Sequence, residues 1–240
     1  MRLDKYLSYA LNLTRSEVNP FIKKNDIKVN GIRITKKDFK IDEDKDKVEV
    51  NGILLTYKKF VYYMLNKPKG LVCSTKGFGN NTIYDLFEDS KYELSSIGRL
   101  DKDTEGLLIV TNDGALNHFL TSPQNHIDKT YYVEIDDDLN EAEMRLFEEG
   151  ILIKDGDEEE FKTDIAKIIK IDNNKYHVII HEGKFHQIKR MFGYFKKNVL
   201  YLKRIAFGDI KLDENLELGK YRELNDEELT ILKKEFNEKR

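Results

Sequence analysis

The densest group of ionisable side chains lies between Gly98 and Gly106. Three carboxylates, from Asp101, Asp103 and Glu105, alternate there with two cations and a hydroxyl. Carboxylates at this spacing could bind a calcium ion, or the segment could be a polar turn that leads into the apolar run after it. These two interpretations predict different residues in the segment that follows.

A calcium loop of the EF-hand type needs a bidentate carboxylate at its twelfth position. That position is Asn112, an amide, and the flanking residues are typical of strands rather than helices. The five histidines are also too dispersed to suggest a coordination shell. We therefore expect no metal site.

A second candidate segment is both basic and aromatic. Residues 182–192 read EGKFHQIKRMF, in which cations are interleaved with aromatic rings. Positive charges bind backbone phosphates and ring faces stack on unpaired bases, so the segment is typical of a site for single-stranded or locally opened RNA. The alternative is an amphipathic helix with Phe185, Ile188, Met191 and Phe192 in the core, and the two interpretations are compatible.

The charge of the chain is segregated, although its net value is only −3. Residues 1–40 carry ten Lys or Arg against four acids, residues 183–204 carry seven bases and no acid, and the other 178 residues sum to −16. Two basic segments in an acidic chain suit a protein that binds a polyanion at defined places. Solvated charged faces would give the same pattern, so charge alone leaves the choice open.

The first basic segment is predicted to form a small module of helices and hairpins. Apolar residues at helical spacing predict a helix over 3–10, and the capping box TRSE at 14–17 predicts the start of a second helix. Pro20 lacks a helical donor, so this helix is either kinked or begins later, with Asn19 as its cap. Asn-Gly pairs at 30–31 and 51–52 are typical of tight turns between strands.

The residues from Phe60 onward have a different composition. Short runs rich in β-branched and aromatic residues predict strands at 61–66, 107–110, 130–135, 165–171, 176–180 and 199–205. Helical patterns are fewer, at roughly 113–121, 139–149, 185–195 and from Asp226. Strands outnumber helices without regular alternation, so we expect an α+β fold on a mixed or antiparallel sheet.

Several classes of protein are excluded by what the sequence lacks. Cys73 is the single cysteine, so an internal disulfide framework is impossible and a reducing cytoplasm fits best. No apolar run approaches the roughly 18 residues of a membrane helix, and charges occupy the place of a signal peptide's apolar region. Neither a glycine-rich phosphate loop nor a nucleophilic triad can be identified. We expect a cytoplasmic protein without a membrane segment.

Five strings follow one another along the larger part of the chain: LNKPKG (65–70), GRLDKDTEGLLIVTNDG (98–114), KTYYV (129–133), EGKFHQIKRMF (182–192) and YLKRIAFG (201–208). In this order they resemble the motifs of the bacterial rRNA pseudouridine synthases of the small-subunit type. The strings RLDKYL, TRSE and KVNG near the start resemble the S4-like RNA-binding domain of that family. The resemblance implies an S4-like domain over 1–57 and a pseudouridine synthase catalytic domain over 58–240.

The resemblance also implies roles for individual residues. Asp101 matches the catalytic aspartate, Tyr131 the tyrosine that packs on the target base, and Lys189 the basic residue that pairs with the aspartate. Arg99 matches a position that helps to hold the flipped nucleotide. The other residues expected to contact RNA are basic side chains of the two basic segments: Arg2, Lys5, Arg15, Lys23, Lys24, Lys28, Lys184, His186 and Arg190.

The implied reaction detaches uracil from its ribose, turns it and rejoins it through carbon, so no cofactor is expected. Burial disfavours a charged carboxylate, which is why Asp101 needs a cation such as Lys189 beside it. Residue types leave open whether Asp101 attacks the sugar, attacks the base or removes a sugar proton. Flipping the target out of folded RNA costs roughly a few kcal/mol, which phosphate contacts from both basic segments would offset.

The expected activity is therefore isomerisation of a uridine in 16S rRNA, with uridine 516 as the target. The expected partner is 16S rRNA or a partly assembled small ribosomal subunit, and the enzyme is expected to be a monomer without an obligate protein partner. A synthase acting on 23S rRNA is one alternative, and a non-catalytic rRNA-binding assembly factor is another.

Overall fold

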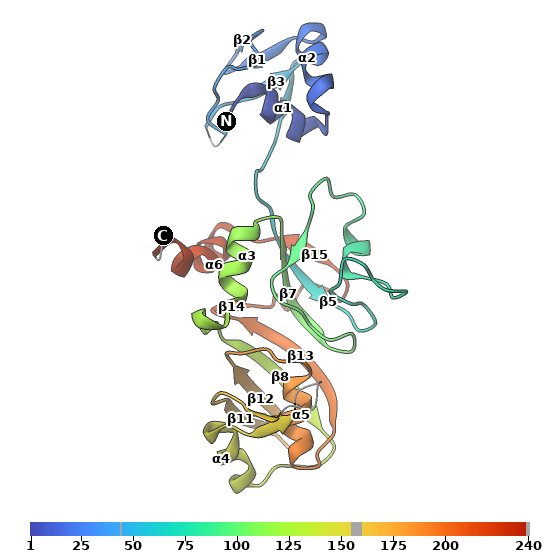
Figure 1. Cartoon of the computed structure of the whole chain (residues 1–240), viewed down its shortest axis with the longest axis vertical. Helices are drawn as coiled ribbons and strands as arrows, with labels where there is room; N and C mark the ends of the chain where they lie inside the picture. Colours follow the sequence, from blue (N-terminus) through green and yellow to red (C-terminus); the bar gives the residue numbers. More distant parts are fainter. Residues whose placement is uncertain (44, 155–159, 239–240) are drawn as a thin grey trace. The chain divides into compact units, whose positions relative to one another are not determined.

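The computed structural model describes residues 1–43, 45–154 and 160–238 (Figure 1). The chain divides into two compact units, Met1–Phe60 and Val61–Arg240, here called unit 1 and unit 2. The sequence predicts a boundary after residue 57, and the structural division falls after Phe60. Within the described ranges, every helix is too short or too polar to cross a lipid bilayer.

Unit 1 packs two helices on one antiparallel sheet of order β2-β1-β3-β4. Its elements are α1 (Leu3–Leu11), α2 (Arg15–Lys24), β1 (Ile27–Val29), β2 (Ile32–Arg33), β3 (Val48–Val50) and β4 (Ile53–Leu55). Asn30 and Asn51 both adopt φ 51° before a glycine, which is the left-handed conformation that a two-residue hairpin turn requires. The two Asn-Gly turns predicted from the sequence are therefore confirmed.

Helix α2 resolves the question raised by Pro20. The backbone N–H of Thr14 donates to the Glu17 carboxylate at 2.8 Å, and the Thr14 hydroxyl donates to it at 2.6 Å. This cap starts the helix at Arg15, and Pro20 lies inside it. The cap and the buried side chains of Val18 and Ile22 hold the helix despite the missing donor.

Unit 2 is built on a mixed sheet with the strand order β11-β12-β8-β13-β7-β5-β15, to which β6 and β14 add at the side. The strands are β5 (Tyr62–Lys67), β6 (Ser95–Ser96), β7 (Glu105–Thr111), β8 (Lys129–Ile135), β11 (Lys167–Asp172), β12 (Lys175–Ile180), β13 (Val199–Phe207), β14 (Ile210–Lys211) and β15 (Tyr221–Glu223). A separate hairpin pairs β9 (Leu152–Lys154) with β10 (Glu160–Lys162).

The α-helices of unit 2 are α3 (Gly114–Thr121), α4 (Glu141–Glu149), α5 (Gln187–Tyr194) and α6 (Asp226–Glu238), with short 3-10 turns at η1 (Ile83–Phe87) and η2 (Pro123–Asn125). These four helices and the six strands predicted from the sequence are all present. The α+β prediction is confirmed.

The strand β7 is apolar from Leu107 to Val110 because both of its faces are buried there. Leu108 and Val110 belong to one core cluster, together with residues of α4 and α5. Leu107 and Ile109 belong to a second cluster, together with residues of α3 and α6. Successive side chains of a strand point to opposite faces, so a strand between two cores shows no polar alternation. Figure 1 shows α3 and α6 near one end of the sheet and α4 and α5 near the other.

The strands β11-β12-β8-β13 join the strands β7-β5-β15 where β13 pairs in parallel with β7. Glu105 lies opposite Lys203 there, and Gly106 lies opposite Arg204. Gly106 has φ +102°, and a Cβ atom there would lie 2.2 Å from the carbonyl oxygen of Arg204. Only glycine permits this close approach of the two backbones. The join places the loop before β7 beside the start of β8 and the helix α5.

Candidate active site

The three residues predicted to be catalytic lie around one hollow. Asp101 lies in the loop between β6 and β7, Tyr131 near the start of β8, and Lys189 in the first turn of α5. The hollow has a volume of 60 Å³ and is lined by Arg99, Leu100, Asp101, Thr104, Tyr131, Ile180, Gly183, Lys184, His186, Gln187, Ile188, Lys189 and Leu202. Polar groups therefore converge on a space whose other walls are apolar.

Lys189 is the cation beside the predicted catalytic carboxylate. Its Nζ atom is 3.2 Å from Oδ2 of Asp101 and 2.5 Å from Oδ1 of Asp103. Nε2 of His186 lies 3.7 Å from the other oxygen of Asp101. Partial burial alone would raise the pKa of Asp103, but the hydrogen bond and charge of Lys189 outweigh it and lower that pKa.

The two carboxylates that share Lys189 differ in exposure. The side chain of Asp101 is 26% exposed and that of Asp103 is 68% exposed. Asp103 thus faces solvent at the rim, whereas Asp101 faces the hollow. The single ammonium group reduces the cost of partly burying the Asp101 charge.

The loop that carries Asp101 is wrapped around a buried ammonium group. Lys67, at the end of β5, is fully buried, and its Nζ atom donates to the carbonyl oxygens of Asp101 at 3.0 Å, Thr104 at 2.9 Å and Pro68 at 3.1 Å. Burial lowers the pKa of Lys67, and nearby acids of the loop oppose this effect only in part. These bonds fix the backbone of the loop and leave the Asp101 side chain free to face the hollow.

Tyr131 is buried in the wall of the hollow. It lies opposite Val178 of β12 and Arg204 of β13 in the sheet. Its hydroxyl makes no hydrogen bond to any residue that the structure describes. A ring held by two neighbouring strands, with an unused hydroxyl, can pack against a planar base and exchange a proton with it.

The segment before α5 is held by the buried side chain of Gln187. Its amide donates to Glu182 at 2.6 Å and its oxygen accepts from the backbone N–H of Lys184 at 2.9 Å. His186 adopts a left-handed conformation with φ 51°, which few residues other than glycine take. Loop and helix together direct His186 and Lys189 toward Asp101.

The helix prediction for this segment is confirmed, with one correction. Ile188, Met191 and Phe192 are buried in the core, as the amphipathic interpretation requires. Phe185 is 58% exposed instead, and it stacks on His186 at a centroid distance of 3.9 Å. It precedes the helix, so the helical spacing does not apply to it.

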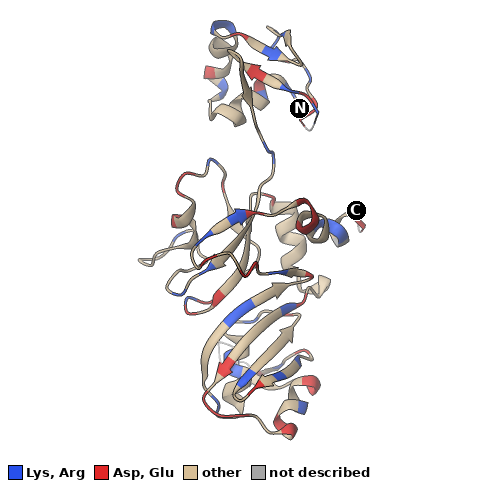
Figure 2. Ribbon diagram, turned by 180° about the vertical axis from the view of Figure 1, so that it is seen from behind, with Lys and Arg blue, Asp and Glu red and all other residues tan. Residues whose placement is uncertain are grey.

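The predicted RNA-binding residues fall into three groups. Arg99, Lys184 and His186 line the hollow with Asp101. Arg190 does not, because it donates to the carbonyl oxygen of Lys154 at 2.7 Å and lines another hollow with Leu152 and Tyr194. The others belong to unit 1, where Figure 2 shows Lys and Arg on both helices and strands. Arg2, Lys5 and Arg15 share a hollow there, whereas Lys23, Lys24 and Lys28 lie outside it.

Three side chains of the site were not singled out by sequence analysis. Lys67 organises the loop, while Thr104 and Arg204 are buried with polar atoms that have no partner among the described residues. All three lie within the five strings that resemble family motifs, yet neither a lysine or arginine in a strand nor a threonine in a loop gives a signal of burial by itself. No group of three His, Cys, Asp or Glu residues within the described ranges is placed to hold a metal ion.

Comparisons with known proteins give two family matches along the chain. Residues 61–194 match the family model described as RNA pseudouridylate synthase, and residues 1–48 match the S4 domain. The ribosomal small subunit pseudouridine synthase A of Haemophilus influenzae is 39% identical over 98% of this chain and 100% of its own. An uncharacterized RNA pseudouridine synthase of Bacillus subtilis is 38% identical over 97% of this chain and 98% of its own.

A solved structure of a pseudouridylate synthase is 38% identical, with a TM-score of 0.66 over 97% of this chain and 99% of that one. The catalytic model spans more than half of the chain, and these relatives align from end to end. The chain therefore belongs to the RNA pseudouridylate synthase family, whose members isomerise uridine in RNA, and it carries an S4 domain before the catalytic domain.

Proposed function

We propose that this enzyme converts one uridine of 16S rRNA to pseudouridine, at the position equivalent to uridine 516. The Haemophilus influenzae relative, which aligns over its full length, is named for the small ribosomal subunit. The observation that carries the catalytic part is the pairing of Asp101 with Lys189 at 3.2 Å in a hollow that Tyr131 also lines.

Asp101 is proposed as the nucleophile or base of the reaction. Its carboxylate is the acid that lines the hollow, and its backbone is held by Lys67. The ammonium group of Lys189 lies 3.2 Å from this carboxylate and offsets part of the cost of placing a charge beside apolar walls. Each of these features supports a reactive charge rather than a structural one.

The isomerisation itself balances without any added reagent. The bond from N1 of uracil to C1′ of ribose breaks, the base turns, and a bond forms from C5 to C1′. C5 loses a proton and N1 gains one, so no electrons are transferred to or from the substrate. Tyr131 is proposed to pack against the turning base, with its hydroxyl positioned to accept or relay the C5 proton.

The hollow must widen to admit a nucleotide. Its 60 Å³ is smaller than the roughly 150 Å³ of an engineered cavity that holds benzene, a ring comparable in size to uracil. Arg99 and Lys184 at the lining have long side chains that can move. The hydroxyl of Thr104, buried without a described partner, is proposed as a hydrogen-bonding group for the bound nucleotide.

The basic residues of both units are proposed to bind the RNA that carries the flipped uridine. Those of unit 2 are Arg99, Lys184, His186 and Arg190, and those of unit 1 are Arg2, Lys5, Arg15, Lys23, Lys24 and Lys28. Their phosphate contacts would offset the cost of flipping. The proposed partner is 16S rRNA, either free or in a partly assembled small subunit. The enzyme is proposed to act as a cytoplasmic monomer on uridine 516 of the folded RNA.

The test uses rRNA labelled with tritium at C5 of uracil, because that hydrogen is released when the C5–C1′ bond forms. We expect the wild-type protein to release tritium from 16S rRNA or from small-subunit particles, and a 16S transcript with cytidine at position 516 to release none. Release from 23S rRNA instead would overturn the choice of substrate. No release from any of these RNAs would favour an assembly factor.

A further inference from the structure

A tyrosine lies in the wall of the basic hollow of unit 1. We propose that Tyr9 is a stacking site for one unpaired RNA base, with Lys5 and Arg15 binding the phosphates on either side of that base. This inference rests on the proposed function in one respect, namely that the ligand of unit 1 is RNA.

The Tyr9 ring is held in place yet remains accessible. It stacks on Tyr57 with a centroid distance of 5.6 Å and an angle of 22° between the ring planes. Tyr57 in turn meets the edge of buried Tyr6 at 5.4 Å, and the Tyr6 hydroxyl donates to the carbonyl oxygen of Leu55 at 3.0 Å. Tyr9 itself is 45% exposed. A ring that is already held by a neighbouring ring loses little conformational entropy when a base stacks on it.

The hollow beside this ring has the size and charge for a nucleotide. Its volume is 510 Å³, within the range typical of small-molecule sites. Lys5 and Arg15 line it, and neither makes an ion pair with a residue that the structure describes. Nζ of Lys5 lies 5.6 Å from the Tyr9 ring centroid. Arg2, which also lines the hollow, is neutralised by Asp4 at 2.6 Å.

These groups favour RNA over an acidic peptide as the ligand. Charge alone would suit either one, but an accessible aromatic ring in a hollow that Lys5 and Arg15 also line suits the alternation of base and phosphate along a nucleotide chain. The side chains of Ser8 and Asn19 add polar groups at the same hollow. Stacking tolerates any base, so the site would recognise an unpaired nucleotide rather than a sequence.

The experiment measures binding of the full-length protein to two short RNA duplexes. One duplex carries a single bulged 2-aminopurine, whose fluorescence falls when it stacks, and the other is fully paired. We expect tighter binding of the bulged duplex, with quenching. Tyr9→Ala should weaken binding of the bulged duplex by about fivefold or more and remove the quenching, while binding of the paired duplex stays unchanged.

Two further variants separate stacking from charge and from folding. Tyr9→Phe keeps the ring and should bind like the wild type, whereas Lys5→Gln should lower the dependence of affinity on salt by about one unit of log–log slope. Tyr9→Ala should leave that slope unchanged. Ile53→Ala removes another exposed apolar side chain of unit 1 and should change neither affinity nor quenching.

The proposal is overturned if Tyr9→Ala binds the bulged duplex as the wild type does, or loses affinity for both duplexes equally. Displacement of the bulged RNA by polyglutamate at equal charge concentration would also overturn it, in favour of an acidic protein ligand. The catalytic proposal is tested separately by tritium release. Quenching at Tyr9 without tritium release would leave the stacking site standing and reject the rRNA activity.

Discussion

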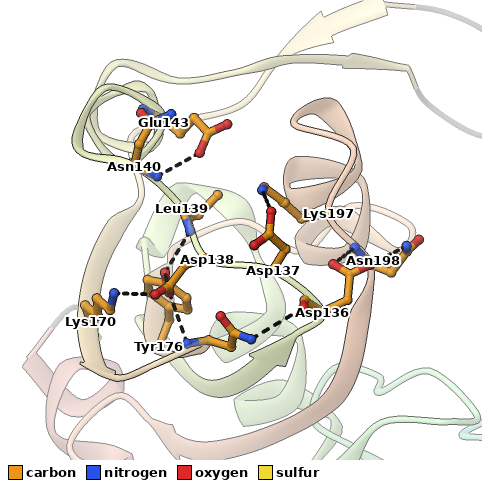
Figure 3. A network of polar contacts seen from close by, with 11 residues as sticks. Asp136, Asp137, Asp138, Leu139, Asn140, Glu143, Lys170, Tyr176, Lys197 and Asn198 are labelled. Atoms are coloured by element: carbon orange, nitrogen blue, oxygen red, sulfur yellow. Dashed lines mark hydrogen bonds and ion pairs between the residues drawn. The ribbon is translucent and has the colours of Figure 1, made fainter.

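Two loops of unit 2 that carry aspartates use their carboxylates in opposite ways. In the loop after β8, each of three consecutive aspartates has its own partner, as Figure 3 shows. Asp136 accepts from the backbone N–H and the side-chain amide of Asn198 at 2.8 and 2.6 Å, and Asp137 pairs with Lys197. Asp138 accepts from Lys170 at 2.5 Å and from Tyr176.

In the loop before β7, two aspartates share one ammonium group, that of Lys189. The bonds that fix this loop come from Lys67 and go to backbone carbonyl oxygens rather than to side chains. In the loop after β8, the carboxylates therefore hold the structure together. In the loop before β7, hydrogen bonds to the backbone hold the structure, and the Asp101 carboxylate faces the hollow. An acidic cluster is thus assigned by where its hydrogen bonds go, and not by its composition.

The sharpest test of this contrast compares Asp101→Asn with Asp138→Asn. We expect Asp101→Asn to lower the rate of tritium release by more than about a hundredfold, because the reactive charge is removed while the fold is not. RNA affinity and the thermal midpoint should change little. Asp138→Asn should instead lower the thermal midpoint and keep the rate per folded molecule. Equal loss of activity in both variants would abolish the distinction.

Lys67→Met tests whether the reactive loop depends on its buried ammonium group. The substitution leaves carbonyl oxygens of Asp101 and Thr104 buried without a donor, so we expect the free energy of unfolding to fall by about 3 kcal/mol. Tritium release should fall with it. Lys102→Met is the matched control, because that lysine lies in the same loop and its ammonium group donates to the exposed side chain of Asn80 at 2.8 Å. Denaturant unfolding of both variants measures the difference.

The contribution of Asp138 to the free energy of unfolding should depend on pH. Hydrogen bonds from Lys170 and Tyr176 lower the pKa of Asp138 to about 2, below the ordinary value of about 3.9. The lowered pKa means that Asp138 stabilises the fold above about pH 4, and that this stabilisation is lost as the pH falls toward 2. The stability difference between the wild type and Asp138→Asn should therefore shrink over that range. Parallel curves would show that Asp138 does not contribute through its charge.

The smallest effect is expected for Asp103→Asn. Asp103 faces solvent, and exposed ion pairs are worth about 0–1 kcal/mol, so the rate of tritium release should stay within about fivefold of the wild type. In this variant Lys189 pairs with Asp101 alone, so Asp103→Asn is also the isosteric control for Asp101→Asn. A loss as large as that of Asp101→Asn would mean that both carboxylates act in the reaction.

Local patterns in the sequence predicted most of the fold. The capping box at Thr14, the Asn-Gly turns and the apolar run of β7 each depend on residues close together in the chain. Pro20 shows the limit of such rules, because the packing of α2 outweighed the missing donor. The pairing of Asp101 with Lys189 was predicted from family resemblance and not from spacing, since 88 residues separate them.

The remaining features depend on the order of strands in the sheet. The bond between Asp136 and Asn198 spans 62 residues, and no local signal identifies it. The burial of Lys67 likewise follows from the loop that folds over it from 34 residues away. Side chains whose partners are chosen by tertiary structure carry ordinary residue types, so a single sequence cannot separate them from surface charges.

The close approach at Gly106 has a consequence for how this enzyme tolerates genetic change. Asp101 precedes β7 on one side of that contact, while Tyr131 and Lys189 belong to the other side. One added methyl group would push the two backbones apart and separate the carboxylate from its ring and its ammonium partner. Selection on catalysis is therefore expected to preserve glycine at position 106, although this residue has no side chain that could react.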